Sequence, residues 1–307
     1  MNQSVFSGID RPIFCTKRHK RFILPGFRTS LILTLLWVGV LVILPITALI
    51  MASFHNGFST FYTLFTSSRI LSALALSFGT AFCAAWICVL LGTILAWALA
   101  RNQHMPGLHI LDVIVDLPFA LPTAIAGITM ATLYGPHGWI GHILSKFHIH
   151  VIFTPIGIIL ALVFVGLPFV VRTMEPALKS LPVEIEETAA TLGASHGQII
   201  RHVILPSLMP SFITAFSLAF ARGVGEYGSV IFIAGNLPHY TEVLSLLIVI
   251  HLERFDYTGA AAIGVITLGF SFTCFLLIAI YRQRFITSNE PAAWKIVKPE
   301  SEHAHEH

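Results

Sequence analysis

The chain has 307 residues, of which 55% are hydrophobic and only 11% are charged, and its mean hydropathy is +0.81. A water-soluble domain of this size would expose too much apolar surface to stay dispersed, so the composition indicates a membrane protein. The formal net charge of +3 fits basic loops beside a bilayer, and nothing in it suggests a nucleic-acid partner.

Six apolar stretches are long enough to cross a bilayer as helices, because a hydrocarbon core of roughly 30 Å takes about 20 helical residues. They cover residues 27–54, 70–100, 108–134, 151–174, 207–234 and 257–281. None alternates polar and apolar residues as a barrel strand does. The sequence therefore predicts an all-α membrane protein with one six-span domain over residues 27–281, and Pro118 and Pro122 make a straight third span unfavourable.

Lys and Arg residues are concentrated in the leader, in the loops after the second and fourth spans, and in the tail. By the positive-inside rule, the leader 1–26 and the tail 282–307 are expected to be cytoplasmic. The four cysteines show no metal-ligand spacing, so no metal site is predicted from them. The tail histidines, His303, His305 and His307, fit either a solvated tail or a weak metal site.

A polar loop at residues 178–206 interrupts the apolar pattern and lies on the side predicted to be cytoplasmic. Ser180 is expected to cap a helix with Pro182 in its first turn, and Glu184, Glu186 and Glu187 suit the positive end of that helix. The loop therefore begins with a short helix near Leu181.

Ile185, Ala189 and Leu192 recur at helical spacing and form one apolar stripe, and Gly193 stands where a left-handed residue would end the helix. A residue larger than glycine at position 193 is expected to carry a conformational penalty and to push the two helix axes apart. Ser195 and Gln198 then form a capping-box pattern that opens a second short helix. A connecting loop with good caps would show the same pattern, so these signals alone leave its role open.

The loop also carries a longer pattern: Glu187-Thr-Ala189, then Gly193 after three intervening residues, and Val203-Ile-Leu205-Pro206 after nine more. This resembles the EAA motif of ABC importer permeases, with Thr188 and Val203 as its two departures. The resemblance implies a type I ABC importer permease fold whose coupling helices fit a groove on an ATP-binding subunit. It assigns that coupling role to Glu187, Ala189, Gly193, Leu205 and Pro206.

The chain itself has no G-x-x-x-x-G-K-[ST] phosphate-binding pattern, so it is predicted not to be an enzyme. ATP and Mg would be used by a separate motor subunit, and no cofactor is expected on this chain. An intramembrane enzyme would need a Ser–His or paired-carboxylate site within a span, and the sequence offers none. A passive channel would need no docking loop.

Residues 220–236, from Phe220 to Asn236, resemble the fifth span of the T-type permeases of sulfate/thiosulfate importers. The family implies that the chain helps to import sulfate or thiosulfate by an alternating-access mechanism. The alternative is a permease subunit of a related importer for molybdate or tungstate. It also implies two copies of the ATPase, a second permease of the W type, and an external sulfate-binding protein in a bacterial-type inner membrane. One sequence does not decide between a heterodimer and a homodimer.

Two sets of charged residues lie within the predicted spans. Arg222 and Glu226 are four residues apart, so they share a helix face and form either a structural ion pair or part of the anion's path. Asp112 and Asp116 lie near the predicted cytoplasmic end of the third span, where they either sit at the membrane interface or act in gating.

Overall fold

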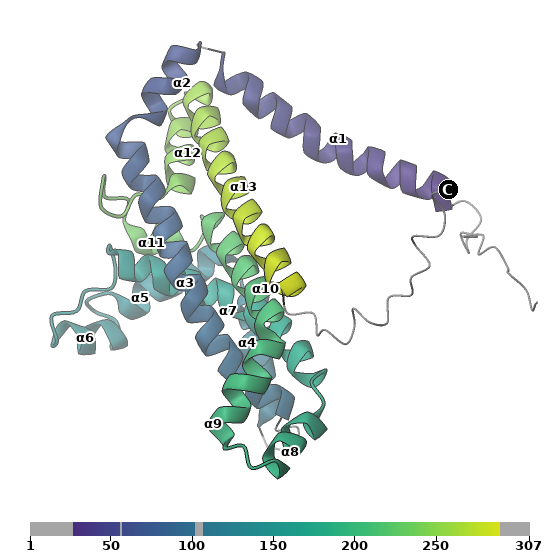
Figure 1. The fold of residues 1–307 in the computed structure, drawn as a ribbon. Helices are drawn as coiled ribbons and strands as arrows, with labels where there is room; N and C mark the ends of the chain where they lie inside the picture. The colour runs from purple at the N-terminus through teal and green to yellow at the C-terminus, as the bar shows by residue number, and fades with distance from the viewer. Residues whose placement is uncertain (1–26, 56, 102–106, 289–307) are drawn as a thin grey trace, which may run out of the picture. The chain divides into compact units, whose positions relative to one another are not determined.

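The computed structural model describes residues 27–55, 57–101 and 107–288, and within them every regular element is a helix (Figure 1). The basic leader, Cys15 and the tail histidines lie outside the described residues. The helices are α1 Phe27–Ser53, α2 Phe58–Phe65, α3 Ser68–Arg101, α4 Leu108–Ala120, α5 Thr123–Tyr134, α6 Trp139–Ser145, α7 Pro155–Lys179, α8 Val183–Thr191, α9 His196–Ile199, η1 Ile200–Ile204, α10 Leu205–Val224, α11 Val230–Ala234, α12 Leu244–Glu253 and α13 Tyr257–Ser288.

The chain divides into two compact units, Met1–Ala48 and Leu49–His307. The first contains most of α1, an apolar helix of 27 residues with Pro45 inside it. The second contains all the other helices, and it holds the core and the candidate site.

The number of spans agrees with the prediction. Five of the helices in the described residues are long and apolar enough to cross a membrane, and α4 and α5 make a sixth if they are counted as one bent span. The bend between α4 and α5 is 110°, which confirms that the third span is not straight. Leu121 is extended because the ring of Pro122 disfavours a helical conformation in the residue before it.

The fifth span was predicted to continue to residue 234, and this is wrong. The helix that is long and apolar enough to cross the membrane here covers His196–Val224, and residues 225–229 form a turn before α11. In this turn, the Glu226 Oε1 atom accepts hydrogen bonds from the backbone N–H and the hydroxyl of Ser229, both at 2.9 Å. Ser229 is the N-cap residue of α11, so the Glu226 carboxylate bonds the residue at which the new helix begins.

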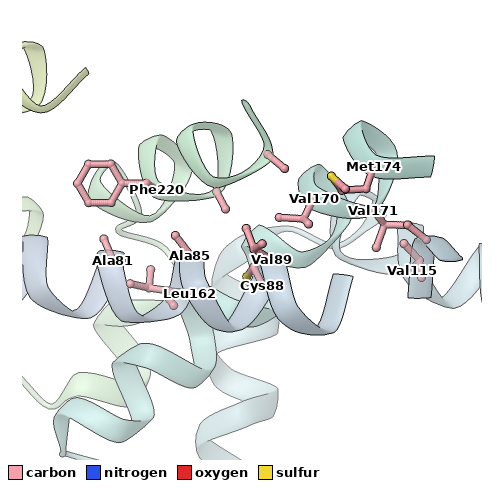
Figure 2. Close-up of a cluster of buried hydrophobic side chains, with 14 of the residues drawn as sticks. Ala81, Ala85, Cys88, Val89, Val115, Leu162, Val170, Val171, Met174 and Phe220 are labelled. Carbon is pink, nitrogen blue, oxygen red and sulfur yellow. The ribbon is translucent and has the colours of Figure 1, made fainter. Parts of the chain in front are cut away.

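The core of the second unit lies where α3, α7 and α10 pack together (Figure 2). Small side chains of α3, among them Ala81, Ala85 and Cys88, let the other two helices approach closely. Val170 and Met174 of α7 fill the space opposite them and are fully buried. Cys83, Cys88 and Cys274 are free thiols.

An ion pair fixes the segment before α12 to the first turn of α3. Glu242 is 1% exposed and accepts two hydrogen bonds from Arg69, at 2.8 Å from Nε and 2.5 Å from Nη2. The backbone N–H of Leu244 also donates to the Ser77 hydroxyl at 2.9 Å. These bonds attach the start of α12 to α3 at the end of the bundle that carries α2, and α8 and α9 lie at the opposite end (Figure 1).

Gly127 sets the distance between α5 and the turn before α11. A Cβ atom at this position would lie 2.5 Å from the carbonyl oxygen of Ser229 and 2.8 Å from its Cα atom. We expect Gly127→Ala to lower the free energy of unfolding by about 1–3 kcal/mol, because backbone atoms must move to admit the methyl group. Thermal unfolding in detergent measures this loss. Gly79→Ala in α3 is the matched control, because a Cβ there meets nothing within 4 Å; an equal loss in both variants would contradict the close-approach argument.

Candidate functional site

The loop at residues 178–206 folds as a short helix joined to a long one. After α8, Gly193 has φ +86°, the left-handed conformation predicted for it. The N–H of Gly193 donates to the carbonyl of Ala190 at 3.0 Å and the N–H of Ala194 donates to that of Ala189 at 3.1 Å. These two bonds are the Schellman arrangement that closes a helix C-terminus, so Ala189 and Gly193 together end α8.

The predicted N-cap of α8 is wrong. Pro182 occupies the cap position, and Ser180 ends α7 instead, with its hydroxyl donating to the carbonyl of Ala177 at 2.8 Å. A serine hydroxyl can satisfy a carbonyl on the preceding helix as well as an N–H on the following one, and only the backbone conformation decides between them. Ser180 is in the right-handed helical region, which suits the end of α7.

The capping box that opens the next helix is confirmed, since the Ser195 N–H donates to the Gln198 side chain at 2.8 Å. The helix that follows is not short as predicted: it runs from α9 through η1 into α10. Pro206 does not break it, because the turn before it is widened, with the Leu205 N–H bonded to the carbonyl of Ile200, five residues back. A π-turn of this kind gives the proline ring the room that a regular helix lacks.

The residues named from the EAA pattern lie along this element. Glu187 and Pro206 are exposed, Leu205 is 44% exposed and Ala189 is half-buried. Ile185, Ala189 and Leu192 share one face as predicted, and with Glu184, Thr188 and Val203 they line a hollow of about 340 Å³. Leu192 is 84% exposed, so it presents an apolar side chain beside this hollow.

Arg222 and Glu226 are in contact at the end of α10. The distance between Arg222 Nη1 and Glu226 Oε2 is 2.6 Å, and the exposed fractions of the two side chains are 33% and 2%. Both oxygens of the Glu226 carboxylate are therefore occupied, one by Arg222 and the other by Ser229. The partial exposure of the guanidinium leaves room for a second contact on Arg222.

Sequence reasoning missed the partner of Asp112 and Asp116. Arg172 of α7 bonds Asp112 at 2.8 Å, Asp116 at 2.5 Å and Glu175 at 2.9 Å, so one guanidinium joins α4 to α7. The contact joins residues 56 positions apart, and no local pattern could reveal it. Asp112 and Asp116 are therefore both ion-paired with Arg172.

The fold and this loop define a class: a helical membrane protein with an exposed apolar and acidic helix at one end of its bundle. Residues 88–287 match the model of a family described as binding-protein-dependent transport system inner membrane component. The sulfate transport system permease protein CysT of Salmonella typhimurium is 42% identical over 265 residues, which are 86% of this chain and 95% of that protein. The CysT protein of Escherichia coli is 41% identical over 86% of this chain and 95% of its own length. The CysT protein of a Synechocystis strain is 40% identical over 82% of this chain and 88% of its own length. The chain therefore belongs to the binding-protein-dependent inner membrane permeases, and within them to the CysT family.

Two groups of solved structures share the fold. A chain of a bacterial ABC transporter involved in the import of the acidic polysaccharide alginate has a TM-score of 0.68 at 19% identity, covering 84% of this chain and 94% of its own. A chain of the MetNI methionine ABC transporter has a TM-score of 0.53 at 18% identity, covering 73% of this chain and 95% of its own. This likeness confirms the type I importer permease fold that the sequence predicted.

Proposed function

We propose that this chain is a permease subunit of an ATP-driven importer that carries sulfate, and also thiosulfate, into the cytoplasm. The observation that carries the proposal is 40–42% identity to three CysT sulfate permeases over more than four-fifths of the chain. Sulfate has two negative charges, and an unaided crossing of hydrocarbon would cost tens of kcal/mol by Born solvation. A protein-lined path driven by a motor meets that requirement.

The proposed assembly contains two copies of an ATPase subunit, a second permease of the W type and an external sulfate-binding protein. A solved alginate ABC transporter of the same fold, with a TM-score of 0.65 at 21% identity, is in complex with a periplasmic protein, which supports a partner of that kind here. With α8 facing the cytoplasm, Glu187, Ala189, Gly193, Leu205 and Pro206 form the surface that the ATPase contacts. Both chain ends then lie in the cytoplasm, and ATP and Mg are bound by the motor alone.

Mechanistically, closure of the two ATPase subunits on ATP would move α8, and the long helices would follow it from an outward-open to an inward-open arrangement. The exposed Leu192 and the hollow beside it give the motor an apolar surface to hold, and the Schellman closure at Gly193 keeps α8 at one angle to α10. Transport then depends on the attachment of α8 to the bundle, because this attachment passes the movement of the motor to the long helices.

Uptake of labelled sulfate into proteoliposomes that contain the purified complex tests the proposal. We expect an ATPase and a second permease to co-purify with the chain, and uptake to need both ATP and the external binding protein. Unlabelled thiosulfate should compete with sulfate, whereas an equal concentration of molybdate should compete poorly. Uptake that continues without ATP would indicate a passive channel, and stronger competition by molybdate would assign the chain to a different oxyanion.

A further inference from the structure

α8 has one polar side-chain attachment to the rest of the bundle. No residue of α8 is buried, and of its residues, all of which the structure describes, Glu186 alone forms an ion pair. Its partner is Arg101, the last residue of α3, and the Arg101 Nη2 atom donates to Glu186 Oε1. The exposed fractions of the two side chains are 18% and 23%, so this pair is screened less by water than a surface pair.

The guanidinium of Arg101 is positioned by α3 itself. It lies 5.7 Å from the centre of the Trp97 ring, one helical turn earlier, close enough for a cation–π interaction. Arg101 Nε is buried and has no hydrogen-bond partner in the described segments. The direction of the guanidinium is therefore determined by Trp97 on one side and Glu186 on the other.

The other described contacts of α8 are of a different kind. Ala189 packs against the apolar core together with Leu181 and Val203 of the same loop. Apolar contacts are non-directional and allow one surface to slide over another, whereas a hydrogen-bonded ion pair resists that movement. Glu184 and Glu187 are exposed and form no ion pair with any residue that the structure describes, so Glu186 differs from both neighbouring carboxylates in α8.

We propose that the Arg101–Glu186 ion pair is a positioning contact that transmits movement of α8 to α3, and through α3 to the core that it forms with α7 and α10. The proposal rests on the proposed function, because the motor subunit supplies the movement of α8. Within this arrangement, Glu186 faces the bundle and the adjacent Glu187 faces solvent, where the motor would bind.

The test uses the complete importer in proteoliposomes and measures sulfate uptake and ATP hydrolysis on the same sample. The variants are Glu186→Gln, Arg101→Gln and the charge swap Arg101→Glu with Glu186→Arg. Glu253→Gln is the matched control, because it removes an equivalent charge from an exposed position outside the loop. Coupling free energies between sites typically correspond to roughly 5–150-fold effects, and we expect about tenfold less sulfate moved per ATP hydrolysed in both single variants.

We expect the charge swap to recover most of the transport ratio, and Glu253→Gln to keep the ratio of the unmodified importer. A contact with only a structural role would lower the yield of the complex and leave the ratio unchanged. Normal ratios in both single variants, or a swap that recovers nothing, would overturn the proposal.

Hydrogen exchange of the α8 amides in the purified complex provides a readout that does not depend on the substrate. Glu186→Gln should raise exchange across Val183–Thr191 and leave the α3–α7 core protected. If the unmodified complex moves no sulfate but this exchange pattern appears, the assigned substrate is wrong and the positioning contact stands. If exchange in α8 is unchanged, the positioning contact is wrong whatever the substrate.

Discussion

Replacement of Gly193 by leucine is expected to leave the chain in the membrane but to abolish ATP-driven uptake and to weaken association with the ATPase. Gly193 has φ +86° and closes α8 through two backbone hydrogen bonds. An L-residue with a side chain loses roughly 1–2 kcal/mol in this conformation, so the closure opens and α8 leaves its angle to α10. The core of α3, α7 and α10 is not touched, which is why we expect insertion and abundance to be normal.

The steric part of the sequence-based expectation for Gly193 is wrong. A Cβ atom at position 193 would meet no other atom within 4 Å, so a methyl group there does not push the two helix axes apart. Only the backbone conformation penalises the substitution. Asparagine tolerates the left-handed conformation better than other residues with a side chain, and this makes it the informative comparison.

The measurement is uptake together with the amount of ATPase that co-purifies with the permease, for Gly193→Leu, Gly193→Ala and Gly193→Asn. We expect leucine and alanine to abolish uptake alike, because both carry the backbone penalty, and asparagine to retain most of it. Gly197→Leu is a control in the same loop, since a Cβ there also meets nothing within 4 Å and Gly197 is not among the glycines with positive φ. Full uptake by Gly193→Leu would contradict the proposed role of this junction.

Sequence reasoning succeeded where the physical cause is local. The Gly193 closure, the Ser195–Gln198 box and the shared face of Ile185 and Leu192 all depend on residues within a few positions of one another. It failed at Ser180, where a hydroxyl can cap either of two adjacent helices and the backbone decides. It also failed at the end of the fifth span, because apolar composition continues through a turn that the Glu226 side chain imposes.

The ion pairs that join distant segments could not be predicted from the sequence. Arg101 and Glu186 are 85 positions apart, and Arg69 and Glu242 are 173 positions apart. In the sequence, Arg101 indicated only the orientation of the second span, because no acidic residue lies within a few positions of it. The tertiary packing of α3 determines that its last residue reaches α8, and that packing comes from many weak apolar contacts that no single motif encodes.

Arg222→Met is expected to reduce the amount of folded chain in the membrane. Glu226 is 3% exposed, and its Oε2 atom lies 2.6 Å from Arg222. Removal of one member of a buried ion pair leaves an uncompensated charge and typically costs about 3–5 kcal/mol. Against a total stability of roughly 5–15 kcal/mol, that loss should be visible as lower abundance and an earlier unfolding midpoint in detergent.

The double variant Arg222→Met with Glu226→Gln separates the two roles considered for Arg222. A neutral glutamine removes the unpaired charge and can still accept the hydrogen bonds from Ser229, so we expect abundance to recover. If the pair is structural, as the buried carboxylate indicates, sulfate uptake recovers in proportion. Recovered abundance without uptake would instead assign Arg222, whose side chain is 33% exposed, to contact with the anion. Normal abundance and uptake in Arg222→Met alone would contradict both roles, because neither a buried pair nor an anion contact survives the loss of the guanidinium.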